Sequence, residues 1–308
     1  MTLFSFIFAF MIEQFRPLDA RKALLPSLQW LADYIQERLH GGRRLHAVLA
    51  WLFAVLPPVI VAAVVYYGLF RVHPLLGLAW NVVVLYICLG FRRASDFFAE
   101  ILMALRMGEL DRARSLIGEW RGHLADSCSS SDVARLAIEE GLLAAHRNVL
   151  GVLFWFVVLP GPSGALLYRM AEFFSRYWGR REGAESAAFG GFARQAFEVL
   201  DWLPARMSAT CFAVVGDFED ALYCWRGQAS RWPDPSSGVL LASGAGALGV
   251  RLGMPVYESG EITERPELGL GDDADPDFMQ STIGLIWRTL VLCLFLLALF
   301  WVASWVGT

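Results

Sequence analysis

Residues 46–70, which read HAVLAWLFAVLPPVIVAAVVYYGLF, decide the fold, together with residues 283–305, which read IGLIWRTLVLCLFLLALFWVASW. Both stretches are long enough to cross a bilayer, because a spanning helix needs about 20 consecutive, mostly apolar residues. After a short tip at residues 71–74, residues 75–91 are apolar again, so the first stretch opens a helical hairpin. The pattern predicts an all-α, polytopic membrane helical bundle, with the lipid bilayer as its first partner.

The composition supports the same class of protein. Of the 308 residues, 56% are hydrophobic and 18% are charged, whereas soluble globular chains carry about 25% charged residues. The formal net charge of −4 argues against a nucleic-acid partner, since nucleic-acid binding depends on a basic face. The five cysteines form no C-x-x-C pair and no Cys/His cluster with zinc spacing. We therefore predict no metal site and interpret all five as structural.

Arginines on the flanks of the hairpin predict its orientation in the membrane. Those outside its two arms are Arg43, Arg44, Arg92 and Arg93. The tip carries Arg71 alone, so the positive-inside rule places the flanks in the cytoplasm and the tip outside. This predicts a multi-pass protein of a bacterial inner membrane. The apolar stretch at residues 2–15 lacks a basic n-region, so we expect it to span or to be re-entrant rather than to be a cleaved signal.

Changes in hydropathy divide the chain into five expected segments. These are an N-terminal membrane segment and hairpin at residues 1–91, a cytoplasmic helical insertion at 92–147, a core with broken helices at 148–260, an acidic loop at 261–282 and a C-terminal transmembrane helix at 283–308. Within the insertion, Gly108–Asp111 predicts a turn and a helix start. Ser129–Asp132 predicts the N-cap of a helix over 133–145.

The core segment contains two expected helix breaks. Residues 149–159 are strongly apolar and are followed by Pro160-Gly161-Pro162-Ser163-Gly164, after which a helical pattern resumes. Residues 192–225 form a long helical pattern in which Pro204 predicts a second break. Broken helices at membrane depth occur where the backbone is buried in protein or lines a cavity. We therefore expect broken or re-entrant helices around a polar interior.

Four charged residues lie beside these breaks: Arg169, Glu172, Asp201 and Arg206. Ionisable groups near membrane depth usually face a bundle interior or a cavity. Arg169 and Glu172 are three residues apart, so they share one helix face. Two interpretations are equally supported: the four residues form a polar pocket for a small molecule, or they form structural ion pairs between packed helices.

Two further motifs have a functional and a structural interpretation. His146 and Arg147 lie where the insertion meets the next apolar block, and they are either a ligand-facing pair or interfacial anchors, the interpretation that their position favours. Residues 244–249, GAGALG, match G-x-G-x-x-G. A dinucleotide site needs a preceding strand and a following acidic residue in a βαβ unit. Close helix packing through small residues is therefore the better interpretation of this run.

Four stretches, in order along the chain, resemble one family. Residues 108–116 (GELDRARSL), 160–169 (PGPSGALLYR), 201–209 (DWLPARMSA) and 246–252 (GALGVRL) are similar to runs of the membrane-bound CobD/CbiB family. The resemblance implies cobinamide-phosphate synthesis, an amide formation in cobalamin biosynthesis that uses ATP and its metal ion. The last run adds Arg251 to the candidate pocket residues.

The sequence departs from this family where acidic groups are expected. The family's E-N-x-S-D motif falls at residues 143–147, which read LAAHR, so Arg147 stands where an acid is expected. The run expected after Arg169 is replaced by MAEFFSRY at residues 170–177. If those acids bind the metal and the nucleotide, this chain has lost that site. ATP and Mg²⁺ are then expected as cofactors only if a synthase activity is retained.

A second branch of the same superfamily is more similar at these positions. Residues 1–4 (MTLF), 145–147 (AHR), 159–162 (LPGP) and 215–221 (VGDFEDA) resemble AmpE-type inner-membrane proteins, which are linked to β-lactamase induction and to signalling. The resemblance implies a modulator or sensor without synthase activity, whose ligand is of the corrinoid or muropeptide class. Two alternatives stay open. One is a cobinamide-phosphate synthase with substituted catalytic groups, and the other is a structural partner in a homo-oligomer or another membrane-protein complex.

Overall fold

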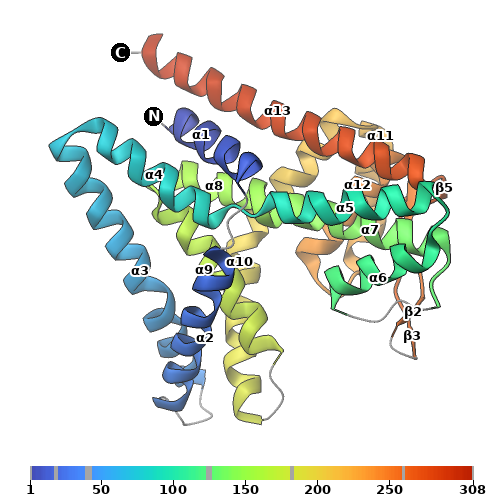
Figure 1. The fold of residues 1–308 in the computed structure, drawn as a ribbon, viewed down its shortest axis with the longest axis horizontal. Helices are drawn as coiled ribbons and strands as arrows, with labels where there is room; N and C mark the ends of the chain where they lie inside the picture. The colour runs from blue at the N-terminus through green and yellow to red at the C-terminus, as the bar shows by residue number, and fades with distance from the viewer. Residues whose placement is uncertain are drawn as a thin grey trace. The chain divides into compact units, whose positions relative to one another are not determined.

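The computed structural model describes residues 2–16, 20–38, 44–122, 127–180, 184–258 and 261–306 (Figure 1). The chain divides into two compact units, each built from two separate stretches. The first unit contains Met1–Gly90 and Gly151–Leu203, and the second contains Phe91–Leu150 and Pro204–Thr308. Two of the boundaries, after Leu150 and after Leu203, fall inside continuous helical runs. One part of each run therefore belongs to the first unit and the other part to the second.

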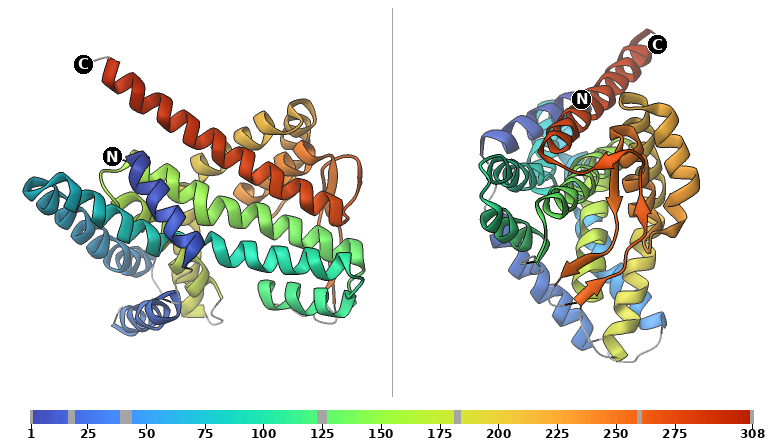
Figure 2. Two further views of the ribbon diagram at one scale, coloured as in Figure 1. Left: turned by 45° about the horizontal axis from the view of Figure 1, so that its top comes forward. Right: turned by 90° about the vertical axis from the view of Figure 1, so that its right-hand side faces the viewer.

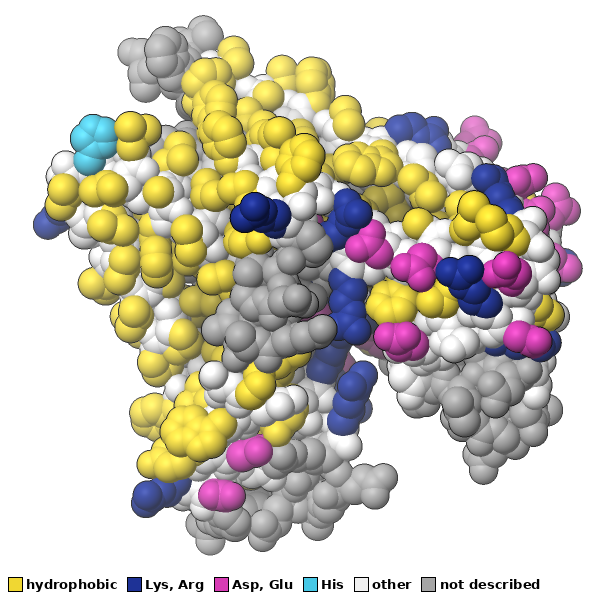
Figure 3. All heavy atoms as spheres, viewed as in Figure 1, with side chains coloured by type: hydrophobic (Ala, Val, Ile, Leu, Met, Phe, Trp, Pro, Cys, Tyr) yellow, Lys and Arg dark blue, Asp and Glu magenta, His cyan; other side chains and the backbone are white. Residues whose placement is uncertain are grey.

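All the regular secondary structure among the described residues of the first unit is helical. The helices are α1 (Thr2–Phe15), α2 (Ala20–Arg38), α3 (Arg44–Val72), α4 (Pro74–Cys88), α8 (Gly151–Val158), α9 (Ser163–Gly179) and the first part of α10 (Ala184–Val215). The expected hairpin is confirmed, because α3 and α4 pack together and are joined at His73, which caps α4. Its outer face is apolar, with exposed side chains such as Phe53 and Val64 (Figure 3).

Four helical runs among the described residues are long and apolar enough to cross a membrane. They are Arg44–Val72, Pro74–Arg106, Ser130–Val158 and Pro276–Ala303, and α1 is a shorter apolar helix. Apolar side chains on the outside of such helices are stable only where lipid or protein covers them. The structure thus confirms the predicted all-α, polytopic helical fold, and the chain is a multi-pass membrane protein.

The first expected helix break is confirmed. Helix α8 ends at Val158, and α9 begins at Ser163, whose hydroxyl donates to the carbonyl of Pro160 at 2.8 Å. The turn needs a glycine at position 164, because a Cβ there would overlap the carbonyl oxygen of Trp155. The sequence PGPSG therefore ends one helix and lets the next pack closely against it.

The second expected break, at Pro204, is wrong. Helix α10 runs without interruption from Ala184 to Val215, through the proline. A proline in a helix leaves the carbonyl four residues earlier without its backbone donor. Here that carbonyl belongs to Leu200, and it accepts a hydrogen bond of 3.2 Å from the indole Nε1 of Trp155. The helix ends instead at Val215, before Asp217 caps α11 (Phe218–Gln228).

The second unit is centred on two buried helices. Its helices are α5 (Phe91–Arg106), α6 (Leu110–Arg121), α7 (Ser130–Ala145), the end of α10, α11, α12 (Pro235–Leu248) and α13 (Pro276–Val306), with a short 3-10 turn at Ala229–Arg231. Helix α7 packs against α5, α12 and α13, and α12 is buried from Ser236 to Ala247. The predicted N-cap is confirmed, since Ser129 and Asp132 form a capping box at the start of α7. The predicted start of α6 after Gly108 is confirmed too.

Five short strands follow α12 among the residues that the structure describes, and the sequence pattern did not predict them. Strand β1 (Val250–Gly253) pairs antiparallel with β4 (Glu267–Leu268) and parallel with β5 (Asp272–Asp273), while β2 (Val256–Glu258) and β3 (Glu261–Thr263) form a hairpin. Figure 2 shows these strands in orange. Strands of two to four residues leave too little alternation of apolar and polar residues for a sequence pattern. They place the segment after α12 against α7.

Candidate functional site

The imidazole of His146 is buried in the second unit. It begins a π-helical turn, His146–Leu150, that continues α7, and such turns occur frequently at functional sites. The side chain is fully buried, and its Nδ1 atom lies 2.9 Å from the hydroxyl oxygen of Ser208 on α10. An interfacial anchor would keep its polar ring in contact with the membrane surface. Interfacial anchoring therefore does not describe His146.

Arg147, the next residue, reaches the N-terminus of α12. Its Nη2 atom donates to the hydroxyl of Ser237 at 3.1 Å and lies 3.8 Å from the carboxylate of Asp234. Asp234 caps α12 by accepting from the backbone N–H of Ser237 at 3.1 Å, and the Ser237 hydroxyl donates to it as well. The side chain of Arg147 is 23% exposed, so the protein does not enclose it fully.

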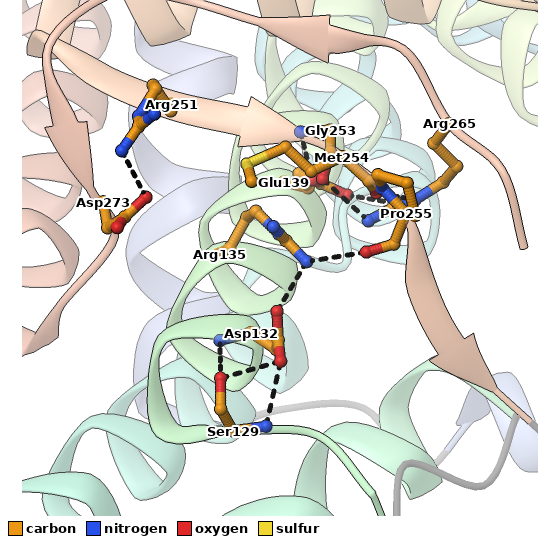
Figure 4. A network of polar contacts seen from close by, with 10 residues as sticks. All are labelled: Ser129, Asp132, Arg135, Glu139, Arg251, Gly253, Met254, Pro255, Arg265 and Asp273. Atoms are coloured by element: carbon orange, nitrogen blue, oxygen red, sulfur yellow. Dashed lines mark hydrogen bonds and ion pairs between the residues drawn. The ribbon is translucent and has the colours of Figure 1, made fainter. Parts of the chain in front are cut away.

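A second polar network joins α7 to the turn that follows β1 (Figure 4). Glu139 is 3% exposed, and its carboxylate accepts from the N–H of Gly253 at 2.8 Å and from Nη1 of Arg265 at 2.7 Å. Arg265 also donates to the carbonyls of Gly253 and Met254, both at 3.2 Å. Met254 has a φ of +66°, which few non-glycine residues adopt. The ion pair therefore holds a strained turn against α7.

Arg135 lies one helical turn before Glu139 and faces the same segment (Figure 4). Its Nη2 atom donates to the carboxylate of Asp132 at 2.7 Å and to the carbonyl of Pro255 at 3.4 Å. The side chain is 6% exposed, and its Nε atom has no hydrogen-bond partner among the described residues. Buried arginines are normally paired, so this guanidinium has an unused donor.

Arg251 lies on β1 and pairs with acidic residues of the neighbouring strands. Its Nη2 atom is 2.8 Å from the carboxylate of Asp273 on β5, and its Nη1 atom is 3.8 Å from that of Glu267 on β4. The guanidinium is 37% exposed, and exposed ion pairs of this kind are worth about 0–1 kcal/mol. The ion pairs of Arg251 thus link three strands, and its partners do not include His146 or Arg147.

Asp201 and Glu172, two of the carboxylates buried in the first unit, lie among the predicted pocket residues. Asp201 is 3% exposed and accepts a hydrogen bond of 2.8 Å from the hydroxyl of Tyr168, which is itself fully buried. Glu172 is 6% exposed and forms ion pairs with Arg169 and, at 3.0 Å, with Arg176. The expected pairing of Arg169 with Glu172 on one helix face is confirmed. Arg206 falls in the second unit, where burial lowers the pKa of its guanidinium.

The sequence pattern did not predict the polar network that joins α7 to the turn after β1. Glu139, Arg135 and Arg265 were not proposed, although a glutamate four residues after an arginine within an apolar helix is a signal for a buried ion pair. The run Asp234-Pro235-Ser236-Ser237 is also typical of a helix N-cap, with a proline at the first helical position, and it could have predicted the start of α12. Within the described residues, no group of three or more His, Cys, Asp or Glu side chains is arranged to hold a metal ion.

Comparison with known proteins finds similarity over most of the chain. The family model described as CobD/Cbib protein matches residues 21–303. The cobalamin biosynthesis protein CobD of Stutzerimonas stutzeri (strain A1501) is 34% identical over 261 residues, which are 83% of this chain and 84% of that relative. CobD of Chromobacterium violaceum is 34% identical over 70% of this chain and 68% of the relative. The cobalamin biosynthesis protein CbiB of Salmonella arizonae is 26% identical over 76% and 75%, respectively. No solved structure matches the chain.

Proposed function

The chain belongs to the CobD/CbiB family, and from this premise we propose that it is a modulator or sensor of the bacterial inner membrane and not a synthase. In this proposal, which follows the AmpE-like resemblance, the protein binds a small molecule beside Arg147 without ATP-dependent amide formation. One observation carries the proposal. Where the family's acidic motif is expected, His146 is buried against Ser208 and Arg147 is bonded to Ser237 beside Asp234.

The residues at this position do not fit a metal–nucleotide complex. Mg²⁺ prefers oxygen ligands, and carboxylates supply most of them in proteins. His146 and Arg147 offer an imidazole and a guanidinium instead. The carboxylate near Arg147 belongs to Asp234, and it already accepts the capping hydrogen bonds of α12. We therefore derive no catalytic step through ATP or a metal ion at this position.

The same residues favour an anionic group on the ligand. The guanidinium of Arg147 attracts carboxylates and phosphates, and the neighbouring carboxylate of Asp234 is engaged in the hydrogen bonds that cap α12. Corrinoid acids and muropeptides both present carboxylates, so both classes agree with this chemistry. A ligand of either class would pair its carboxylate with Arg147.

Complementation tests the loss of synthase activity. A strain that lacks cobinamide-phosphate synthase is supplied with this protein or with the Stutzerimonas stutzeri relative, and growth that depends on cobalamin is measured. We expect the relative to restore growth and this protein to fail, although an immunoblot finds it in the membrane fraction. Growth restored by this protein would overturn the non-synthase proposal.

Thermal-shift measurements test ligand binding at Arg147. The detergent-solubilised protein is heated with ATP–Mg²⁺, with a corrinoid acid or with a muropeptide. We expect a corrinoid or a muropeptide to raise the melting temperature and ATP–Mg²⁺ to leave it unchanged. Arg147→Ala should remove the shift, whereas Arg112→Ala, at an exposed ion pair with Glu109, should retain it. If no compound shifts the melting temperature, the ligand-binding proposal is wrong.

A synthase remains the second candidate. It is favoured by the curated relatives, since a protein named for cobalamin biosynthesis aligns with 83% of this chain. In that case other carboxylates, such as the buried Glu139, would have to replace the missing motif. The complementation experiment decides between the two candidates, because a synthase must restore growth.

A further inference from the structure

Two cysteines from distant parts of the chain lie in contact in the second unit. Cys211 is on α10 and Cys293 is on α13, 82 residues later, and their Sγ atoms are 3.9 Å apart. Both are partly exposed, whereas Cys88, Cys128 and Cys224 are buried. Sequence patterns do not predict this pair, because the two residues share no short motif.

The distance between the two sulfur atoms is close enough for bond formation. A disulfide bond is about 2.05 Å long, so the Sγ atoms must approach by about 1.9 Å. Rotation of a cysteine side chain between staggered rotamers moves its sulfur by more than this.

We propose that Cys211 and Cys293 are a redox-active dithiol that a hydroperoxide converts into an intramolecular disulfide. The Cys211 thiol gives up its proton, the thiolate attacks one peroxide oxygen, and the O–O bond breaks to form a sulfenic acid. The other oxygen takes up that proton and leaves, as water when the oxidant is hydrogen peroxide. The Cys293 thiol then attacks the sulfenic sulfur, so that the S–S bond forms, the S–O bond breaks and a second water leaves. Two thiols are oxidised and one peroxide is reduced, and a dithiol reductant reverses the reaction.

The disulfide would join α13 to the part of α10 that contacts His146. Cys211 lies three residues, or about one helical turn, after Ser208, and the Ser208 hydroxyl contacts the imidazole of His146. Oxidation would therefore fix the helix turn next to this pair. The inference does not depend on the proposed function, because it rests on the contact between the two cysteines.

Thiol counting on the full-length protein in detergent tests this proposal. The protein is treated with an equimolar amount of hydrogen peroxide, unfolded in dodecyl sulfate and labelled with a maleimide, and its mass is measured. We expect the five thiols of the reduced chain to fall by two, to three, and to return to five with dithiothreitol. Digestion without reductant should release a peptide pair joined through residues 211 and 293.

Two serine variants distinguish this bridge from other oxidation. Cys224→Ser should still lose two thiols, because Cys224 takes no part in the pair. Cys211→Ser should yield no peptide pair and should not lose two thiols. An unchanged count of five in the native protein, a pair of thiols lost from Cys211→Ser, or a disulfide between two chains would each overturn the proposal.

Discussion

At the scale of single residues, Glu139 holds two partners from a different part of the chain. Its carboxylate accepts from the N–H of Gly253 and from the guanidinium of Arg265, and the side chains of the ion pair are 5% and 11% exposed. Glu139→Ala leaves a buried cation without its counter-charge. We expect a loss of about 3–5 kcal/mol in the free energy of unfolding, measured by denaturation in detergent.

A matched variant separates this effect from a general loss of charge. Glu109→Ala removes an ion pair with Arg112 in which both side chains are about half exposed, and Glu109 makes no side-chain cap hydrogen bond. We expect it to cost about 0–1 kcal/mol. Equal losses for the two variants would show that Arg265 finds another partner, contrary to the structure.

Cys224 on α11 offers a test by pH. Burial, and then the charge of Asp220, raise the pKa of this thiol to about 11 from 9.0. The folded protein therefore keeps the proton more tightly than the unfolded chain, so this thiol's contribution to stability is lost as the pH rises from about 9 through 11. In a variant with Cys224 as its sole cysteine, the alkylation rate should still rise about tenfold per unit between pH 9 and 10. A plateau near pH 9 in the folded protein would contradict the raised pKa.

Sequence spacing predicts contacts within a helix and misses contacts between distant residues. Arg169 and Glu172 are three residues apart, and their ion pair followed from helical geometry alone. Glu139 and Arg265 are 126 residues apart, and Cys211 and Cys293 are 82 residues apart. Nothing local in the chain links the members of these pairs. These two contacts could therefore be identified only from the structure.

At the scale of elements, Pro204 shows why one helix break was predicted wrongly. A proline ends a helix when the carbonyl four residues earlier stays without a donor. In α10 the indole of Trp155 donates to that carbonyl, on Leu200, at 3.2 Å. A side chain 45 residues away thus removes part of the cost, which no local pattern reveals. The caps at Ser129 and Asp217 depend on neighbouring residues only, and the sequence signal at Ser129 was sufficient.

This explanation predicts coupling between Trp155 and Pro204. Trp155→Phe keeps an aromatic ring but leaves the Leu200 carbonyl unpaired, and we expect it to cost about 1–3 kcal/mol of unfolding free energy. Pro204→Ala supplies a backbone N–H to the same carbonyl. In that background Trp155→Phe should cost about 1 kcal/mol less, as a double-mutant cycle of unfolding free energies measures. The same cost in both backgrounds would show that the indole does not stabilise the helix at the proline.

At the scale of the whole molecule, hydropathy predicted the class of fold, and composition predicted a protein that lies in a lipid bilayer. Helices such as α3 and α13 carry enough apolar residues to span a bilayer by themselves, so their assignment needs no knowledge of the rest of the chain. The short strands after α12 are different, because β1 takes its partners from residues that come up to 22 positions later. Their pairing depends on packing against α7 and α12, which only the assembled unit supplies.

The positive-inside rule predicts the orientation of α3, with its N-terminus in the cytoplasm and its C-terminus outside. The helix has 29 residues, about 43 Å at 1.5 Å per residue, which exceeds the apolar core of about 30 Å, so both ends reach water. The exposed end residues Leu45 and Val72 are 65% and 75% exposed. In a variant whose five cysteines are replaced by serine, Val72→Cys should react with a membrane-impermeant maleimide in intact spheroplasts. Leu45→Cys should react only after permeabilisation, because the positive-inside rule keeps Arg43 and Arg44 in the cytoplasm. The reverse pattern would invert the hairpin, and reaction of both cysteines in intact spheroplasts would show that α3 does not span.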